Sequence, residues 1–297
     1  SSRNCCSAPF PDWGPSLSSR GGRAAHILSM TIEQPSAGRV LICGDWHGNT
    51  TWAVKVLFAA ARSGYDTIIH VGDLKVLWPD QEGPDGYPFD NTLDQVLKAN
   101  GQTLLFVDGN HDNHRALRTL PVNDAGFGVI TENLLYVPRG HRWSMGGLRF
   151  GGLGGAYSID RFFGHEGDDW WLEEEVSQDD VVKLGSEPLD VLITHDVPQG
   201  TQVVSNALVS HKDELLSQAS RLLISDAVRN TAPSQVFSGH WHQRVTSRLP
   251  YRETVVEVLD REHHPGNAVV LDLETRTVTP FDPIGLQLPG YAAHGKA

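Results

Sequence analysis

Cysteine is scarce in this 297-residue chain, and long hydrophobic runs are absent from it. Cys5 and Cys6 are adjacent in an irregular segment and Cys43 lies in an apolar one, so the three match neither a disulfide framework nor a zinc-binding spacing. We expect Cys43 to be a small buried hydrophobic residue. No segment reaches the roughly 18 apolar residues that a membrane helix needs, and the first residues lack the apolar centre of a secretory signal. We therefore expect a cytoplasmic protein without a membrane span.

Positive charge is also in short supply. The chain has 24 Lys and Arg against 36 Asp and Glu, which gives a formal net charge of −12, and no cluster of Lys and Arg forms a basic stripe. Because an acidic surface repels a phosphate backbone, nucleic acid is not expected as a partner. A nuclease subunit would need a basic groove or an added dimerisation domain, and the sequence predicts neither. The oligomeric state is not determined by these features.

Composition divides the chain at about residue 38. Residues 1–38 are rich in Ser, Gly, Pro and Arg and lack hydrophobic periodicity, which is typical of an irregular extension. The chain does not begin with Met, and Met30 precedes a more regular stretch, so it stays open whether residues 1–29 belong to the native protein. Residues 39–297 show patterned hydrophobicity and are predicted to form one domain.

The first half of that domain alternates apolar runs with helical patterns. Apolar runs at 39–43, 66–71 and 102–107 are separated by helix-like stretches at 50–64 and 91–101. Strand, helix, strand, helix, strand with continuous apolar runs is typical of parallel strands covered by helices.

Local signals mark the ends of these helices. Thr50 or Thr51 is expected to cap the first helix, and Asn91 or Thr92 the second. The second half of the domain is strand-rich and partly antiparallel, with one long helix at about 212–228 and a hairpin at its end.

Polar side chains follow five of the apolar segments at the point where each strand is predicted to end. In open α/β sheets, ligands bind outside the carboxyl ends of the strands, so these side chains are expected to meet at one edge. They are Asp45, His47, Asp73, Asn110, His195, His240 and His242. A mixed nitrogen and oxygen set of this size is too large for one tetrahedral zinc ion and fits two cations. One carboxylate must then bridge the cations, and His240 and His242 are expected to bind one each.

Each of these residues also has a simpler interpretation. Asp45 and Asp73 could be turn or helix-capping carboxylates, and His195 could be a hydrogen-bonded core histidine. His111 and Asp112 could simply brace the turn that contains them. Their shared position at strand ends favours the metal site over these separate explanations.

Five short motifs occur in a fixed order: Asp-x-His at 45–47, Gly-Asp at 72–73, Gly-Asn-His-Asp at 109–112, a lone His195 and Gly-His-x-His at 239–242. Together they resemble the calcineurin-like metallophosphoesterases over about residues 39–275. The stretch GGLGGAYSIDR with the Trp pair after it is similar to one in bacterial and phage members. The resemblance implies an α/β (α+β) fold, in which two mixed sheets form a sandwich flanked by helices, with a dinuclear metal site at the carboxyl ends of the strands.

The same resemblance implies a role for each site residue. Asp45, His47 and His242 would hold one ion and Asp73 would bridge. Asn110, His195 and His240 would hold the second. His111 would be the catalytic acid beside the substrate, and Asp112 its orienting carboxylate. Manganese is the metal expected first, with iron, zinc, cobalt or nickel as alternatives.

The implied function is hydrolysis of a phosphomonoester or phosphodiester by in-line attack of a metal-bridging hydroxide. A small-molecule phosphate ester or nucleotide is the expected substrate because the chain is acidic. The motif at Asp73 continues as GDLK, without the Asp-Arg of the protein Ser/Thr phosphatase branch, which argues against protein-phosphatase activity while keeping it as an alternative. A non-catalytic metal-binding scaffold is the other alternative.

Residues 77–91, LWPDQEGPDGYPFDN, form a Pro- and Gly-rich segment before the second predicted helix. Long loops in compact domains are often functional lids, and Trp78, Tyr87 and Phe89 could cover a base or an aromatic ester. A loop lying on the surface is an equally good interpretation, so the role of this segment stays open.

Overall fold

The computed structural model describes residues 30–31, 35–36, 38–84, 86–159, 161, 165–168, 170–205 and 209–285. Most of the predicted extension, with Cys5 and Cys6, lies outside the described residues. Within them, the strands form two seven-stranded sheets. Sheet I has the order β14-β13-β2-β3-β4-β6-β5, and sheet II has the order β1-β7-β8-β9-β10-β12-β11.

Sheet I contains the parallel strands that the first half of the domain predicts. These are β2 (Arg39–Cys43), β3 (Thr67–His70), β4 (Thr103–Phe106) and β6 (Leu134–Tyr136). The short β5 (Gly128–Val129) pairs antiparallel with β6 at one edge. At the other edge β13 (Ala268–Asp272) and β14 (Val278–Phe281) form an antiparallel hairpin, as predicted, and β13 pairs antiparallel with β2.

Sheet II is built mostly from the second half of the chain and is mixed. Its parallel strands are β8 (Leu148–Leu153), β9 (Val191–Thr194), β10 (Gln235–Ser238) and β12 (Val255–Val258). The antiparallel neighbours are β7 (Arg142–Met145) and β11 (Val245–Arg248). β1 (Met30–Thr31), from the predicted extension, pairs parallel with β7.

Five α-helices lie among the described residues, and two of them begin earlier than the sequence predicts. They are α1 (Thr50–Arg62), α2 (Pro88–Asn100), α3 (His114–Arg118), α4 (Gln178–Leu184) and α5 (His211–Thr231). The cap of α1 is Asn49, whose side chain accepts a hydrogen bond from the Trp52 N–H, so the prediction of Thr50 or Thr51 is wrong. The prediction of Asn91 or Thr92 at the start of α2 is also wrong, because Pro88 supplies a preset φ at the first helical position.

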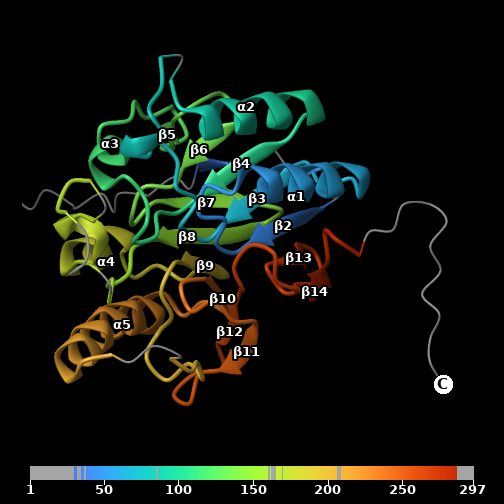
Figure 1. Cartoon of the computed structure of the whole chain (residues 1–297). Coiled ribbons are helices and arrows are strands. Elements are labelled where there is room, and N and C mark those ends of the chain that lie inside the picture. The colour runs from blue at the N-terminus through green and yellow to red at the C-terminus, as the bar shows by residue number, and fades with distance from the viewer. Residues whose placement is uncertain are drawn as a thin grey trace, which may run out of the picture.

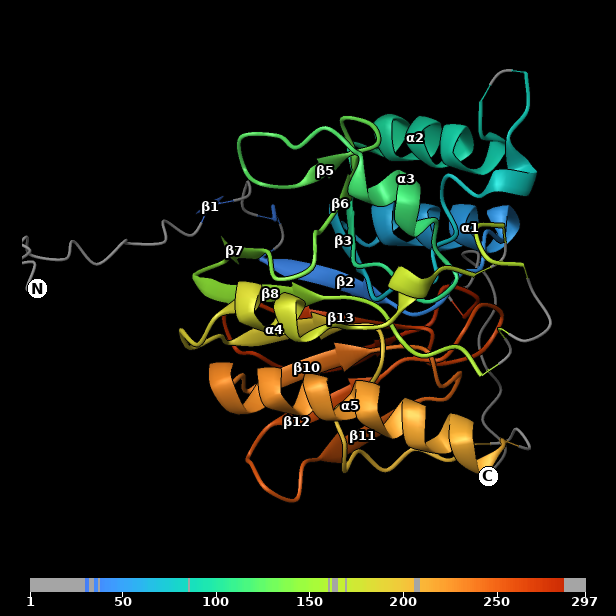
Figure 2. The ribbon, with the colours of Figure 1, turned by 90° about the vertical axis from the view of Figure 1, so that its left-hand side faces the viewer.

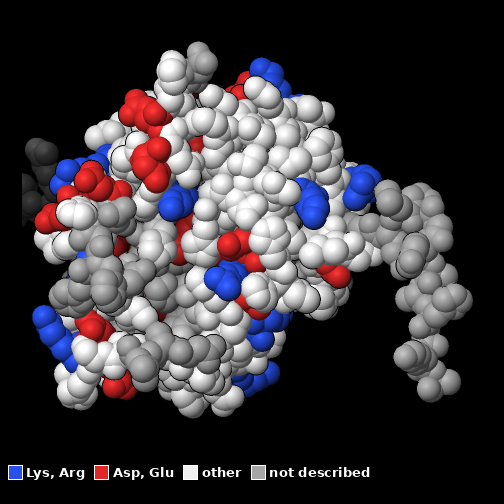
Figure 3. Space-filling model, viewed as in Figure 1, with Lys and Arg blue, Asp and Glu red and all other residues white. Residues whose placement is uncertain are grey.

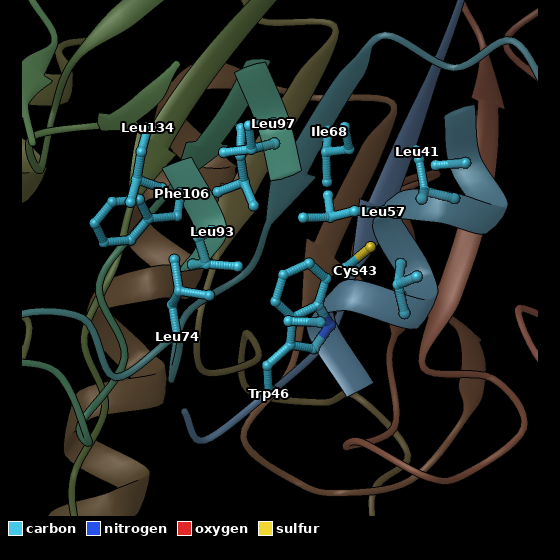
Figure 4. Packing of buried hydrophobic residues seen from close by; sticks show 14 of the residues in the cluster. Leu41, Cys43, Trp46, Leu57, Ile68, Leu74, Leu93, Leu97, Phe106 and Leu134 are labelled. Carbon is cyan, nitrogen blue, oxygen red and sulfur yellow. The ribbon is translucent and has the colours of Figure 1, made fainter. Parts of the chain in front are cut away.

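Three buried clusters show how the layers pack. One cluster lies between α1, α2 and sheet I, and Figure 4 shows Leu57 beside Ile68 and the buried Cys43, and Leu93 beside Phe106. A second cluster joins the facing sides of the two sheets, and a third lies between sheet II and the helices α4 and α5. The result is a two-sheet sandwich with helices on both outer faces (Figures 1 and 2), which confirms the predicted fold class.

The segment at 77–91 lies on the surface in its middle, but its ends are anchored in the core. Trp78 is only 4% exposed and its ring lies 5.3 Å from that of Trp171, while Phe89 is 2% exposed in the first cluster. A one-turn 3₁₀ helix (Pro79–Gln81) and the first turn of α2 account for much of the rest. Both open interpretations are therefore wrong for Trp78 and Phe89, because burial of the two rings stabilises the core instead.

Charge and hydrophobicity on the surface agree with the composition. In the described part of the chain, no helix combines the length and apolarity that a membrane crossing requires. Lys and Arg are dispersed among Asp and Glu on the face drawn in Figure 3. The described residues of this face thus show no continuous basic band for a nucleic-acid backbone.

Candidate metal centre

The predicted site residues lie in loops that directly follow β2, β3, β4, β9 and β10. These strands belong to both sheets, so the site forms where the carboxyl ends of the two sheets meet. Four of the site residues have the left-handed backbone that non-glycine residues rarely adopt. They are His47, Asp73, His240 and His242, with φ of 45°, 55°, 64° and 49°. Such conformations cost about 1 kcal/mol or more each and concentrate at functional sites.

The first donor group consists of Asp45, His47, Asp73 and His242. One ligand atom from each of these residues lies within 4.8 Å of the others, which is close enough for all four to hold one metal ion. His242 Nε2 is 3.2 Å from Asp45 Oδ2, and His47 Nε2 is 3.4 Å from Asp73 Oδ2. Donors bound about 2.1 Å from one ion lie about 3 Å apart, so these spacings suit a shared cation.

The second donor group consists of Asn110, His195, His240 and the same Asp73. Asn110 Oδ1 is 3.1 Å from His195 Nε2 and 2.9 Å from His240 Nδ1. His195 Nε2 is also 3.3 Å from Asp73 Oδ1. The two oxygens of Asp73 therefore face different donor groups, Oδ2 toward His47 and Oδ1 toward His195.

Hydrogen-bond chemistry shows that lone pairs converge here. His195 Nδ1 lies 2.9 Å from the Val71 carbonyl oxygen, which can only accept, so Nδ1 carries the proton. In the neutral ring, Nε2 then carries a lone pair, which is directed at the Asn110 and Asp73 oxygens. His47 is arranged in the same way, with Nδ1 beside Glu262 and Nε2 beside Asp73. Acceptors that face one another in this way fit a bound cation.

Two glycines permit the close approach of these loops. A Cβ added at Gly109 would overlap Oδ1 of Asp73, and one added at Gly239 would overlap Oδ1 of Asp45. The residues that precede Asn110 and His240 must therefore lack a side chain. This explains the Gly-Asn and Gly-His pairs in the sequence.

Negative charge concentrates between the donor groups. Burial tends to lower the pKa of His47, but hydrogen bonds with Asp73 and Glu262 outweigh it and raise the pKa to about 11. At His195, burial also acts to lower the pKa, but the negative charge of Asp73 outweighs it and raises the pKa to about 10. Burial and the positive charge of His195 together lower the pKa of His240 to about 3. The carboxylates of Asp73 and Glu262 thus favour positive charge between the donor groups.

His111 and Asp112 lie beside the donor groups. The His111 N–H donates to Asp73 Oδ1 at 2.8 Å, and its half-buried side chain lines the cleft above the donors. Asp112 is fully buried and accepts hydrogen bonds from the N–H groups of Gly109, Asp73 and Lys75 at 2.7, 3.0 and 2.6 Å. Asp112 thus ties the loop after β4 to the loop after β3, which is the bracing role left open by the sequence.

The structure adds partners that sequence reasoning missed. Glu262 Oε2 lies 2.8 Å from His47 Nδ1. Ser158 Oγ accepts from the Asn110 amide nitrogen at 2.8 Å and donates to Glu174 Oε2 at 3.2 Å, so the Asn110 oxygen is turned toward His195 and His240. No motif spacing connects these residues to the donors.

A cleft with a volume of about 960 Å³ opens over the donors. Besides Asp73, Asn110, His111, His240 and His242, it is lined by Trp241, Arg221, Arg261 and His264, none of which the sequence analysis placed at the site. Trp241 stands between the two histidines of the last motif, and its indole N–H donates to Asp196 at 2.8 Å. The cleft therefore brings cationic and aromatic side chains beside the donor groups.

Comparisons with known proteins agree with this geometry. The family model described as calcineurin-like phosphoesterase matches residues 38–244. The lariat debranching enzyme of Schizosaccharomyces pombe is 26% identical over 159 residues, which are 48% of this chain and 34% of that protein. The lariat debranching enzyme of Danio rerio is 26% identical over 210 residues, which are 57% of this chain and 36% of that protein. The chain thus spans about a third of the length of these curated relatives.

Solved structures share the fold. One crystal structure is similar with a TM-score of 0.51 and 17% sequence identity, and the alignment covers 81% of this chain and 97% of the other. At this identity, the likeness concerns the arrangement of sheets and helices alone.

Proposed function

Because the chain belongs to the calcineurin-like phosphoesterase family, we propose that it is a metal-dependent hydrolase of phosphate monoesters or diesters. The observation that carries this proposal is the position of Asp73. Its Oδ2 lies 3.4 Å from His47 Nε2 and its Oδ1 lies 3.3 Å from His195 Nε2. One carboxylate joins two donor groups, as two neighbouring cations require.

Seven side chains would hold the two ions. Asp45, His47 and His242 would bind the first, and Asp73 would bridge. Asn110, His195 and His240 would bind the second. Imidazole, carboxylate and amide donors suit several transition metals, and we infer manganese as the first metal to test. When bound, two divalent ions activate water for attack and neutralise the charge that develops on the phosphoryl oxygens.

The remaining steps belong to side chains of the protein. Water attacks phosphorus and releases a proton to solvent, and the ester P–O bond breaks. The leaving oxygen takes a proton from His111, which lines the cleft and regains a proton from solvent. Asp112 holds the loop of His111 in register with that of Asp73 through its three backbone hydrogen bonds. We propose that His111 is the catalytic acid and that Asp112 positions its loop.

Hydrolysis assays test this function directly. The purified chain is treated with chelator, supplied with Mn²⁺, and assayed with p-nitrophenyl phosphate and bis-p-nitrophenyl phosphate. Metal-dependent release of nitrophenol from either ester is the expected result. Two bound ions with no hydrolysis of either ester would instead support a non-catalytic metal-binding scaffold.

A further inference from the structure

The cleft extends well beyond the metal donors. Its volume of about 960 Å³ is at the upper end of the roughly 300–1,000 Å³ typical of pockets for drug-sized ligands. A phosphoryl group held by the donors would fill a small part of it. The rest of the cleft is therefore available to the group esterified to the phosphate.

One wall of this distal part is a polar row on α5. Glu214, Ser217, Gln218 and Arg221 all line the cleft, and their spacing of three, four and seven residues places them on one face of the helix. Ile224 and Val228, three and seven residues after Arg221, continue this side of α5 and pack on sheet II. The row thus offers a carboxylate, a hydroxyl, an amide and a guanidinium to a ligand.

Another part of the cleft wall is apolar and held in place. Val204 is 66% exposed and Ile159 is 38% exposed, and both line the cleft. The Gln243 side chain fixes the Val204 backbone by accepting from its N–H at 3.2 Å and donating to its carbonyl at 2.9 Å. Exposed apolar side chains in a cleft mark a surface that a ligand covers.

Trp241 connects the two walls to the metal donors. The Arg221 guanidinium lies over the Trp241 ring, 5.1 Å from its centroid, while the indole N–H is held by Asp196. The ring is therefore a rigid surface between the polar row and the two histidines beside it. A planar group attached to the phosphate by a short linker would contact this surface.

We propose that the distal cleft binds the nucleoside of a nucleotide ester whose phosphate lies at the metal donors. The base suits the apolar wall, and the sugar hydroxyls and polar base edges suit the row on α5. Glu214 in that row repels a further phosphate, which disfavours a polynucleotide. This substrate class rests on the proposed function only for the placement of the phosphate.

Equilibrium binding tests the subsite without relying on hydrolysis. Calorimetry with the Mn²⁺-loaded protein compares the non-hydrolysable phosphonate analogue of thymidine 5′-monophosphate, as the nucleotide, with inorganic phosphate. We expect the nucleotide to bind at least about 10-fold more tightly, since filling an apolar pocket contributes at least this much discrimination. Equal dissociation constants for the two ligands would overturn the proposal.

Matched variants locate the effect in the cleft. Val204→Ser and Gln218→Ala should each weaken nucleotide binding about 3- to 10-fold and leave phosphate binding unchanged. The controls are Val182→Ser, at a valine that is 68% exposed on α4, and Asn230→Ala, at an exposed amide near the end of α5. Variants and controls that behave alike would also overturn the proposal.

Hydrolysis assays distinguish failure of the nucleoside subsite from failure of the proposed phosphoesterase function. Thymidine 5′-(p-nitrophenyl phosphate) and bis-p-nitrophenyl phosphate share a leaving group, and only the first carries a nucleoside. A lower KM for the thymidine ester, lost in Val204→Ser, supports the subsite. Hydrolysis of both esters with equal KM values overturns the subsite alone, whereas tight nucleotide binding without any hydrolysis supports it and contradicts the proposed function.

Discussion

Nδ1 of His47 lies 2.8 Å from Oε2 of Glu262, a residue 215 positions later in the chain. The Glu262 N–H also donates to the Asp45 carbonyl oxygen at 2.8 Å, so the loop of Glu262 is fastened to the first motif. A carboxylate in this position sets the tautomer and orientation of a metal-binding imidazole and raises its basicity.

Replacing Glu262 should therefore weaken metal binding without removing a ligand. Glu262→Ala is expected to lower Mn²⁺ affinity roughly 10- to 100-fold, and Glu262→Gln less, because its amide oxygen can still accept from Nδ1. Metal titration by calorimetry measures both. Glu132→Ala, at an exposed glutamate, is the control, and an affinity equal to the control would contradict this role.

Asp73 is predicted to be the least replaceable donor. Asp73→Asn removes the charge shared by both donor groups, so most metal and nearly all activity should be lost. Elemental analysis of the purified variant provides the measurement, with Asp124→Asn at an exposed position as the control. Two ions per chain in Asp73→Asn would show that Asp73 does not bridge.

Ser158 should affect the second donor group alone. Its hydroxyl holds the Asn110 amide nitrogen, and Ser158→Ala frees that amide to rotate its oxygen away from His195 and His240. We expect one of two Mn²⁺ sites to weaken roughly 10-fold or more. Calorimetric titration resolves the two sites, and Ser186→Ala on the surface is the matched control. Equal weakening of both sites would argue for a general loss of structure.

His111 is expected to matter most when the leaving group is poor. His111→Ala should keep both metals and lose roughly 10²- to 10⁴-fold in rate for an alkyl phosphate ester, because the leaving alkoxide needs a proton. The loss should be much smaller for a nitrophenyl ester, whose leaving group departs unprotonated. Equal losses for both esters would contradict the acid role. His211→Ala, at an exposed histidine, serves as the control.

Glu174 makes stability depend on pH. Burial raises the pKa of this carboxyl from 4.5 to about 8, against the lowering effect of the Ser158 hydrogen bonds. The folded state thus binds the proton more tightly than the unfolded state. The resulting stability is fully present below pH 4.5 and is lost as pH rises through about 8, by at most about 1.4 kcal/mol per pH unit.

Urea unfolding of the chelated protein between pH 5 and pH 8 tests this dependence. Glu174→Gln keeps the shape of the side chain and cannot ionise. The free energy of unfolding of this variant should therefore rise relative to that of the wild type as pH rises. Glu132→Gln controls for removal of an exposed carboxylate. Parallel pH profiles for Glu174→Gln and the wild type would show that Glu174 does not titrate in this way.

Local pattern predicted the elements better than their ends. Parallel strands under α1 and α2, the long α5 and the closing hairpin are confirmed because continuous apolar runs and helical periodicity reflect burial directly. The predicted starts of α1 and α2 were wrong because Asn49 and Pro88 outweigh the capping preference of Thr50, Thr51, Asn91 and Thr92. The segment at 77–91 was misread because burial of Trp78 depends on Trp171, which is distant in the sequence.

The sequence by itself determined which donors exist and that they follow strand ends. A strand that emerges from the core must end at the sheet edge, so the polar residue after it is placed by the apolar run before it. Tertiary structure alone decided that Glu262 meets His47, that Ser158 and Glu174 turn Asn110, and that α5 lines the cleft with Arg221. Those contacts depend on how the two sheets and their loops pack together, and no spacing along the chain records that packing.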